Sequence, residues 1–192
     1  MDIIFATSNL HKLNEAKAII GDLFSLITPR ELGIYEDIPE DEDTLQENAI
    51  FKARYLWERC GKVCFADDTG LEVDALGGAP GVRSARYASD ECDSRRNMQK
   101  LIKELNGISN RKARFRTIVA LVIDDKVSLF EGQLKGSIIN SPSGSEGFGY
   151  DPIFLPEGYT KTLAELTSHE KNLISHRGIA MRKLSDFLKS ML

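Results

Sequence analysis

Two periods of hydrophobic and polar residues run along the first third of the chain, and they predict a strand followed by two helices. The apolar run 3–6 is typical of a short strand, and apolar residues at helical spacing over 10–20 predict a helix that ends before Gly21. Residues 44–47 form a capping box, in which a threonine and a glutamate satisfy the first free N–H groups of a helix. The apolar stripe that follows predicts a helix that ends near Gly61.

Polar residues interrupt this pattern at two places. On the second predicted helix, Asn48 and Lys52 are one turn apart, so they share a side at the edge of the apolar stripe. Further on, the short apolar segments 63–66 and 71–73 flank the tract Asp-Asp-Thr-Gly at 67–70. We expect these segments to be strands that pair across a turn, which places two carboxylates at a strand end.

The second half of the chain predicts a helix, a long hairpin and a closing helix. Residues 93–105 have a helical pattern, and the β-rich runs 113–124 and 127–139 flank the clearest turn signal of the chain, Asp124-Asp125-Lys126. From about residue 175 the tail predicts an amphipathic helix. Its apolar residues are Ile179, Leu184, Phe187, Leu188 and Leu192.

The order of these elements indicates an α/β fold. It favours an elongated mixed β-sheet flanked by helices over a regular doubly wound parallel sheet. A chain of 192 residues is expected to form a single domain over 1–192. Two lobes are consistent with the pattern, and the cleft between them is the expected active site.

Composition and charge narrow the class of protein. The 42% hydrophobic and 28% charged residues are typical of a globular domain, and the net charge of −4 argues against binding of nucleic acid, which needs a basic excess. The longest apolar run, 118–123, is too short to span a membrane, and the N-terminus lacks the basic lead of a signal peptide. We therefore expect a cytoplasmic protein without a membrane partner. Cys60, Cys64 and Cys92 are expected to be free thiols, buried or half-buried.

A first group of polar residues lies where the first predicted strand gives way to a helix. The N–H groups and the dipole of a helix N-terminus attract phosphate, and hydroxyl, amide and ammonium groups add donors. This is a candidate phosphate site, and the alternative is an ordinary N-cap followed by a solvated lysine. The segment is Thr7-Ser8-Asn9-Leu10-His11-Lys12.

Asp67 and Asp68 are adjacent carboxylates, which repel each other unless a cation or hydrogen bonds compensate. Magnesium takes one or two protein carboxylates and fills its other positions with water and phosphate oxygens. The tract therefore predicts a Mg²⁺ site, which Glu40 or a neighbour in the acidic run 40–43 completes. The alternative for both acidic tracts is a solvated turn.

Two glycine-rich segments, 77–81 and 144–152, allow positive φ and close approach of the backbone to a ligand. The second adds aromatic rings that can stack on a base and a carboxylate that can accept from a base N–H. Lys171, His176 and Arg177 can donate to phosphate or to a carbonyl oxygen. The alternative for these three is the solvated basic start of a helix.

Together these segments resemble the inosine triphosphate pyrophosphatase family, whose members are also described as dITP/XTP pyrophosphatases. Six motifs stand in the family's order over nearly the whole chain, which a chance match does not explain. They are ATSNLHK at 6–12, ENAIFKA at 47–53, ADDTGL at 66–71, GGAPG at 77–81 with SARY at 84–87, GFGYDP at 147–152 and SHRG at 175–178. Residues 88–90 lack the glycine that often follows SARY, and the run 40–43 is unusually acidic, which leaves Glu40 open as the metal ligand.

The resemblance implies a two-lobed, mixed-sheet subunit that forms a homodimer and uses Mg²⁺. It implies that residues 7–12 hold the triphosphate and that Lys52 assists them. Asp68 is implied to bind Mg²⁺ and act as general base, with Glu40 as a second metal ligand and Thr69 in contact with substrate. The base and phosphate pocket is implied to consist of Phe148, Gly149, Tyr150, Asp151, Lys171, His176 and Arg177.

The expected reaction is hydrolysis of ITP, dITP or XTP between the α and β phosphates, which releases a nucleoside monophosphate and pyrophosphate and clears these nucleotides before their incorporation into DNA and RNA. Asp68 would orient and deprotonate the water. Donors from His176 and Arg177 would favour 6-oxo purines over adenine. Two rival hypotheses are a pyrophosphatase for modified pyrimidines and a non-catalytic nucleotide- or RNA-binding protein. The acidic balance and the paired aspartates count against the second.

Overall fold

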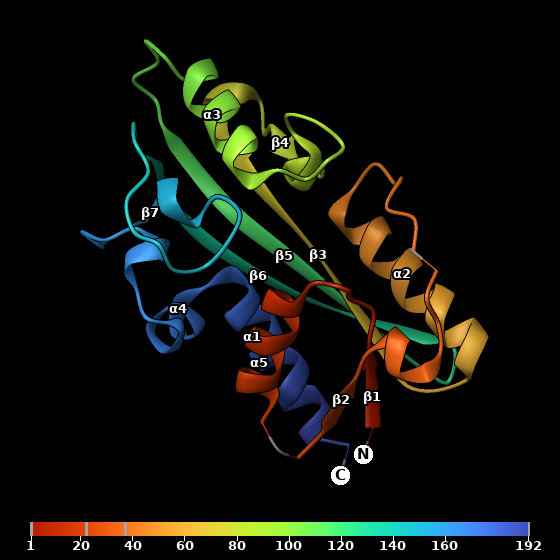
Figure 1. The fold of residues 1–192 in the computed structure, drawn as a ribbon. Helices are drawn as coiled ribbons and strands as arrows, with labels where there is room; N and C mark the ends of the chain where they lie inside the picture. The colour runs from red at the N-terminus through yellow and green to blue at the C-terminus, as the bar shows by residue number, and fades with distance from the viewer. Residues whose placement is uncertain (1, 22, 37, 192) are drawn as a thin grey trace. The chain divides into compact units, whose positions relative to one another are not determined.

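The computed structural model describes residues 2–21, 23–36 and 38–191 (Figure 1). The strands are β1 Asp2–Phe5, β2 Ser25–Ile27, β3 Cys64–Val73, β4 Pro80–Gly81, β5 Lys112–Ile123, β6 Lys126–Ile138 and β7 Phe154–Pro156. The α-helices are α1 Leu10–Ile20, α2 Leu45–Cys60, α3 Ser94–Glu104, α4 Ser168–Ile174 and α5 His176–Lys189. Short 3-10 helices lie at Pro29–Leu32, Asp74–Leu76, Ser84–Arg86, Asp151–Ile153 and Leu163–Glu165.

Local capping explains where the main helices begin and end. The side chains of Asn9 and Asp93 accept hydrogen bonds from first-turn N–H groups of α1 and α3. Thr44 caps α2 in the same way, and Gly61 ends α2 in the left-handed conformation. These three helices lie where the sequence pattern predicts them. None of the described helices is long and apolar enough to span a membrane.

The described strands form one mixed sheet in the order β2-β1-β3-β5-β6-β7, with β4 paired to β3. β1 is parallel to β2 and β3, whereas β4 is antiparallel to β3 and β7 is antiparallel to β6. The predicted hairpin joins β5 to β6 through Asp124 and Asp125, whose φ angles of 47° and 64° suit a tight hairpin turn. The α/β class and the mixed sheet are confirmed.

The prediction for the acidic tract was wrong, because β3 is one continuous strand through residues 67–70. Leu71 pairs with Gly81 of β4 rather than with a preceding strand across a turn. The two carboxylates therefore lie in the middle of a buried strand. This is possible because cations from three helices reach them, as described below, so the tract needs no turn into solvent.

Some elements carried no usable sequence signal. β2 and β7 have three residues each, and α4 has seven, which is too short for a hydrophobic period to emerge. The closing helix was predicted from about residue 175, and α5 begins at His176. Leu192, which was predicted to join its apolar face, lies outside the described residues.

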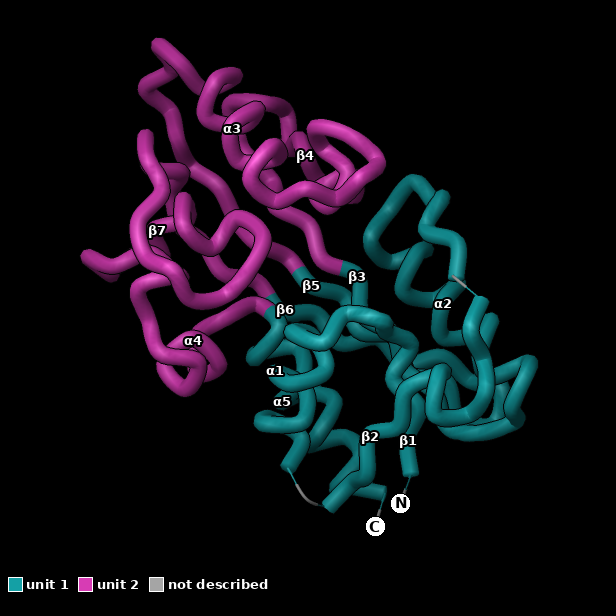
Figure 2. Tube along the Cα trace, in the orientation of Figure 1, with its two compact units in different colours: residues 1–68, 117–132, 177–192 teal, residues 69–116, 133–176 magenta. Residues whose placement is uncertain are grey.

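The chain divides into two compact units (Figure 2). Unit 1 comprises Met1–Asp68, Thr117–Gly132 and Arg177–Leu192, and unit 2 comprises Thr69–Arg116 and Gln133–His176. β3, β5 and β6 contribute residues to both units. The division agrees with the prediction of two lobes. The predicted cleft and the predicted single domain over 1–192 stay predictions.

In unit 1 a hydrophobic core lies between the sheet and the helices α1 and α5. Ile3 and Phe5 of β1 join this core, together with Leu13 of α1 and Leu184 of α5. Alternate strand residues face opposite sides of a sheet, so Ile4, which is also buried, faces away from this core. Figure 1 shows α2 on the other side of β1 from α1 and α5. Both faces of this part of the sheet are therefore covered.

In unit 2 a second core gathers on one face of the sheet. Leu71 and Val73 of β3 and Phe115 of β5 pack there with Leu101 of α3 and with Leu105, which directly follows α3. The intervening residues of these strands, which point to the other face, are polar. This alternation leaves one face of the unit 2 sheet hydrated.

Candidate functional site

The acidic tract contributes one fully buried carboxylate to unit 1. Asp67 is 1% exposed and accepts hydrogen bonds from Lys12 Nζ at 3.0 Å and Arg177 Nε at 3.1 Å. Burial by itself favours the protonated form, but the surrounding cations outweigh it and lower the pKa of Asp67. Asp67 therefore stays ionised and holds two cations in place.

The cap of α1 places Lys12. Asn9 Oδ1 accepts from the N–H groups of His11 at 2.9 Å and Lys12 at 3.2 Å, and Thr7 Oγ1 accepts from the Asn9 N–H at 3.1 Å. The N-cap alternative is thus present, but the lysine is not solvated, because its side chain is only 17% exposed and ion-paired. The exposed residues of the predicted phosphate segment are Ser8, Leu10 and His11.

Arg177 is buried, so the solvated helix start proposed as its alternative is wrong. Its side chain is 2% exposed, and Nη1 donates to Glu15 Oε2 at 2.6 Å while Nε donates to Asp67. Glu15 lies on α1 three residues after Lys12, so this helix supplies a cation to Asp67 and an anion to Arg177. Glu15 was not predicted from the sequence, although its position three residues after Lys12, on the same side of the helix, could have indicated it.

Asp68 has weaker cationic partners than Asp67. Lys52 Nζ lies 3.5 Å from its Oδ1, and Asn48 Nδ2 donates to its Oδ2 at 3.2 Å. Burial raises the pKa of Asp68, and the attraction of nearby lysines only partly opposes this shift. A carboxylate with a raised pKa accepts a proton more readily than an ordinary aspartate.

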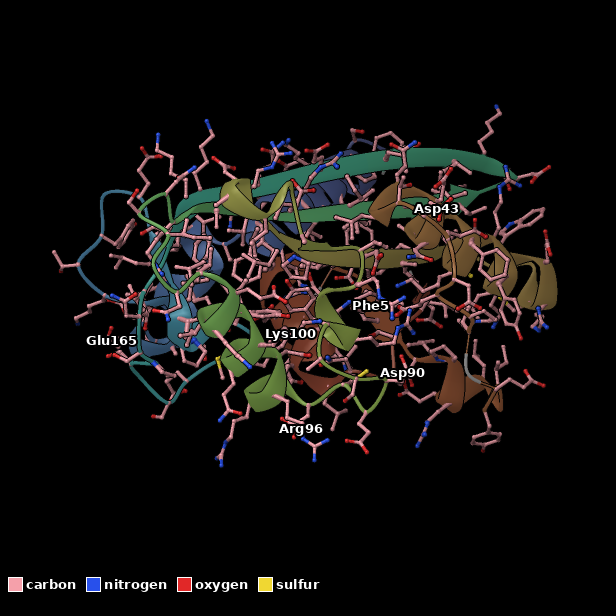
Figure 3. All side chains as sticks on the ribbon, turned by 90° about the horizontal axis from the view of Figure 1, so that it is seen from above. Phe5, Asp43, Asp90, Arg96, Lys100 and Glu165 are labelled. Carbon is pink, nitrogen blue, oxygen red and sulfur yellow. The ribbon has the colours of Figure 1, made fainter. Side chains whose placement is uncertain are left out.

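Glu40 belongs to the same group of side chains. Lys52 Nζ donates to Glu40 Oε1 at 2.5 Å and to the carbonyl oxygen of Asp67 at 2.8 Å. Burial disfavours the ammonium, but the neighbouring carboxylates outweigh it and raise the pKa of Lys52. The rest of the acidic run is exposed, which agrees with the solvated alternative there; Asp43 at its end is labelled in Figure 3.

The oxygens around Lys52 fit a hard divalent cation with few protein ligands. Glu40 and Asp68 both direct carboxylate oxygens at the Lys52 ammonium, so their geometry already converges on positive charge. Mg²⁺ needs only one or two such carboxylates when water and phosphate fill its other positions. Among the described residues, no group of three or more His, Cys, Asp or Glu side chains is arranged to hold a metal.

Unit 2 holds a separate buried ion pair. Lys171 Nζ donates to Asp151 Oδ2 at 2.7 Å, and the two side chains are 5% and 4% exposed, so the solvated alternative for Lys171 is wrong. The same oxygen accepts from the Phe148 N–H at 2.8 Å, and the ammonium lies 4.7 Å from the centre of the Phe148 ring. Gly147 permits this arrangement, because a Cβ at that position would lie 2.2 Å from Asp151 Oδ2.

Two more predicted pocket residues are held firmly in unit 2. His176 is 4% exposed, so its solvated alternative is also wrong, and it stacks on Phe115 with ring centroids 4.5 Å apart. Tyr150 is equally buried, and its hydroxyl donates to the Ser84 carbonyl oxygen at 2.8 Å. Tyr150 therefore supports the loop that carries Asp151.

Two other predicted site residues have simpler settings. The predicted Gly149 has a positive φ of 64°, and Thr69 is half-buried in β3.

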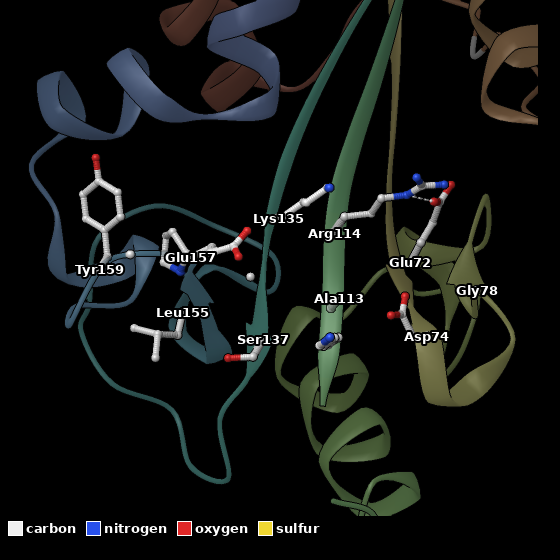
Figure 4. Close-up of a pocket in the computed structure, with 14 residues that line it drawn as sticks. Glu72, Asp74, Gly78, Ala113, Arg114, Lys135, Ser137, Leu155, Glu157 and Tyr159 are labelled. Carbon is white, nitrogen blue, oxygen red and sulfur yellow. Dashed lines mark hydrogen bonds and ion pairs between the residues drawn. The ribbon is translucent and has the colours of Figure 1, made fainter. Parts of the chain in front are cut away.

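A groove of about 760 Å³ lies on the hydrated face of the unit 2 sheet (Figure 4). Its lining carries charges of both signs, and Arg114 Nε and Glu72 Oε2 form an ion pair at 2.5 Å within it. No predicted site residue lines this groove. We therefore do not assign it to the substrate.

The three cysteines are free. Cys64 is buried and Cys60 is half-buried, as predicted. Cys92 is exposed, contrary to the prediction, because it lies in the irregular segment before α3.

The fold and these side chains define a class of protein. It is an α/β protein in which paired aspartates of one strand meet three lysine and arginine side chains, an arrangement suited to phosphate and a divalent cation. The chain belongs to the Ham1 family, which matches residues 3–187. This confirms the resemblance carried by the six motifs.

Curated relatives and solved structures agree with this assignment. The chain is 50% identical over 187 residues to the dITP/XTP pyrophosphatase of Porphyromonas gingivalis, covering 97% of this chain and 96% of that one. It is 46% identical to the dITP/XTP pyrophosphatase of Flavobacterium psychrophilum, covering 99% and 100%. The structure of the Staphylococcus aureus Ham1 protein has a TM-score of 0.92 at 36% identity, covering all of both chains.

Proposed function

We propose that this chain is a Mg²⁺-dependent nucleoside triphosphate pyrophosphatase that hydrolyses the non-standard purine nucleotides dITP, ITP and XTP to the monophosphate and pyrophosphate. The observation that carries the proposal is the setting of Asp68. It is a buried carboxylate in the middle of β3, its Oδ2 accepts from Asn48, and Lys52 Nζ lies 3.5 Å from its Oδ1. Two curated relatives of this chain are named dITP/XTP pyrophosphatases.

The charges of unit 1 support binding of a cation together with a polyphosphate. Three cationic side chains face four carboxylates, which leaves one net negative charge. They are Lys12, Lys52 and Arg177 against Glu15, Glu40, Asp67 and Asp68. This excess of negative charge attracts a divalent cation. The two positive charges of the bound cation then favour binding of phosphate. Glu40 and Asp68 are the residues that would hold Mg²⁺, which supplies charge neutralisation at the phosphates and a more acidic water.

The hydrolytic step uses Asp68 as the general base. Asp68 orients a water and takes its proton while the water oxygen attacks phosphorus at the α–β bridge. The attacked atom is the α-phosphorus, so its bond to the α–β bridging oxygen breaks, the electron pair leaves with pyrophosphate, and the nucleoside monophosphate keeps the oxygen of the water. Lys12 is ion-paired with Asp67 and Lys52 with Asp68, and both offset the developing charge. The hydroxyls, amide and N–H groups of residues 7–12 bind the triphosphate, with Thr69 as a further contact.

Unit 2 supports recognition of the base. Asp151 can accept from the N1–H of hypoxanthine or xanthine, and Phe148 offers a ring for stacking. Lys171 and His176 can donate to the C6 carbonyl oxygen, which adenine lacks. A base contact of Arg177 stays a prediction, because its Nε and Nη1 donate to carboxylates in this structure.

Three further properties are part of the proposal. The family resemblance supports a homodimer, and a substrate drawn from the nucleotide pool supports a cytoplasmic enzyme. The net charge of −4 supports the absence of nucleic-acid binding. Light scattering at micromolar concentration tests the dimer directly, and a monomer mass would contradict it.

The deciding experiment is release of pyrophosphate from a panel of triphosphates with and without Mg²⁺. We expect dITP, ITP and XTP to be turned over roughly tenfold or more faster than ATP, GTP, dUTP and dTTP, and only with the metal present. A preference for dUTP would favour the rival enzyme for modified pyrimidines. No pyrophosphate from any nucleotide would favour a binding protein without catalysis.

A further inference from the structure

Asn48 places a polar amide side chain at a buried position of α2. It lies in the first turn of α2, whose start is set by the cap from Thr44. This start turns Asn48 inward, next to the buried Leu45 and Ala49, and only 1% of it is exposed. Burial of an amide is costly unless both of its ends are hydrogen-bonded, so its partners explain why it is there.

Both ends of the Asn48 amide are satisfied by defined partners. Its Oδ1 accepts from the backbone N–H of Glu42 at 3.1 Å, and its Nδ2 donates to Asp68 Oδ2 at 3.2 Å. A backbone N–H can only donate and a carboxylate can only accept, so these partners allow one orientation of the amide. Asn48 therefore connects the acidic run 40–43 to β3.

We propose that Asn48 is a positioning residue for the cation site, which holds the Asp68 carboxylate and the segment that carries Glu40 in one arrangement before the metal arrives. The inference rests on the proposed function, since it takes Asp68 and Glu40 as the metal ligands. It adds a residue that itself contacts neither metal nor substrate.

The geometry around Asp68 gives the physical reason. Asn48 fixes Oδ2, while Lys52 Nζ lies 3.5 Å from Oδ1, so the carboxylate plane is held from both sides. Each carboxylate oxygen has two acceptor positions, so one remains on each for a cation or a water. Without Asn48 the carboxylate can rotate, and the acidic run loses its link to β3. Supporting hydrogen bonds of this kind typically change metal affinity or activity by about 10–100-fold.

The test is Asn48→Ala, assayed for Mn²⁺ binding without nucleotide, for thermal unfolding and for turnover of XTP at saturating Mg²⁺. We expect the dissociation constant for Mn²⁺ to rise about tenfold and kcat to fall about 10–100-fold. The KM for XTP should change little, because Lys12 and the 7–12 segment keep their own contacts. Gln46→Ala, at an exposed position of the same helix, is the matched control and should match the wild type in all three assays.

Three results separate the alternatives. A lower unfolding temperature with wild-type Mn²⁺ affinity and kcat would show that Asn48 is purely structural and overturn the inference. If Asp68→Asn, run alongside, also leaves Mn²⁺ binding and turnover intact, the metal site of the proposed function is what failed. Should Asn48→Ala not fold, Asn48→Ser keeps a small polar group with a shorter reach, and wild-type metal binding in that variant would equally overturn the inference.

Discussion

The charged cluster of unit 1 and the ion pair of unit 2 are both buried, but they are built differently. In unit 1, Asp67 has two cations within hydrogen-bond distance, and one of them, Arg177, has a second carboxylate partner. In unit 2, Lys171 donates to Asp151 next to an aromatic ring, and the Phe148 N–H donates to the same carboxylate oxygen. The first is a network of charges with an excess of carboxylates, and the second is neutral.

This difference teaches which part of a nucleotide each unit suits. A network that is one cation short has a place for a divalent metal and then for phosphate charge. A neutral pair beside an aromatic ring suits an uncharged, flat base with donors and acceptors on its edge. Because Asp67 has two cations within hydrogen-bond distance, we expect the network to tolerate loss of one lysine better than the ion pair of unit 2 does.

The largest expected effect is on catalysis in unit 1. Asp68→Asn keeps the shape of the side chain but removes its ability to take a proton, so we expect turnover of dITP and XTP to fall about 10²–10⁴-fold with the fold intact. Pyrophosphate release measures turnover, and circular dichroism measures whether the fold is intact. Asp186→Asn, on the exposed side of α5, is the matched control. Near-normal activity of Asp68→Asn would remove Asp68 from the chemistry.

The next largest expected effect is a difference in stability between variants that lack a lysine in unit 1 or in unit 2. Lys171→Met takes the ammonium away from a buried carboxylate, and we expect a loss of about 3–5 kcal/mol in the free energy of unfolding. Lys12→Met should cost only about 1–2 kcal/mol, because Asp67 keeps Arg177. Urea unfolding of both variants gives the comparison, with the exposed Lys62→Met as control. Equal losses of unfolding free energy in the two variants would show that the second cation at Asp67 does not compensate for the loss of Lys12.

The smallest effect concerns the loop that carries Asp151. Gly147→Ala should destabilise the protein by about 1–3 kcal/mol more than Gly149→Ala, because its new Cβ would press on the Asp151 carboxylate. Both glycines have positive φ, but a Cβ at Gly149 would meet nothing within 4 Å, so Gly149→Ala isolates the backbone strain. Thermal unfolding measures the difference. If the two variants unfold alike, the close approach of Gly147 to Asp151 has no energetic weight.

Local signals predicted the parts of the fold that local chemistry controls. The capping box at 44–47 and the turn at 124–125 depend on residues within a few positions, so they could be read from the chain. The same holds for the six motifs, which led to the Ham1 family. The most serious error was at 67–70, where a local pattern typical of a turn lies inside a strand.

That error has a physical cause. A carboxylate inside a buried strand is stable only when cations neutralise it, and the cations at Asp67 come from 55 residues before it and 110 residues after it. No window of sequence around 67–70 contains them. The burial of Lys171, His176 and Arg177 was missed for the same reason, since their partners lie on other elements.

By itself, the sequence determined the helices α1, α2, α3 and α5, the long hairpin, the family and the set of residue types that the chemistry needs, because these depend on short-range patterns. Only the tertiary structure decided how the two aspartates differ. It places Asp67 between two cations, which lower its pKa, and Asp68 beside Asn48 and a more distant ammonium, where burial raises its pKa. Electrostatic energy depends on distance in space and on burial, and neither quantity is written in the order of residues along the chain.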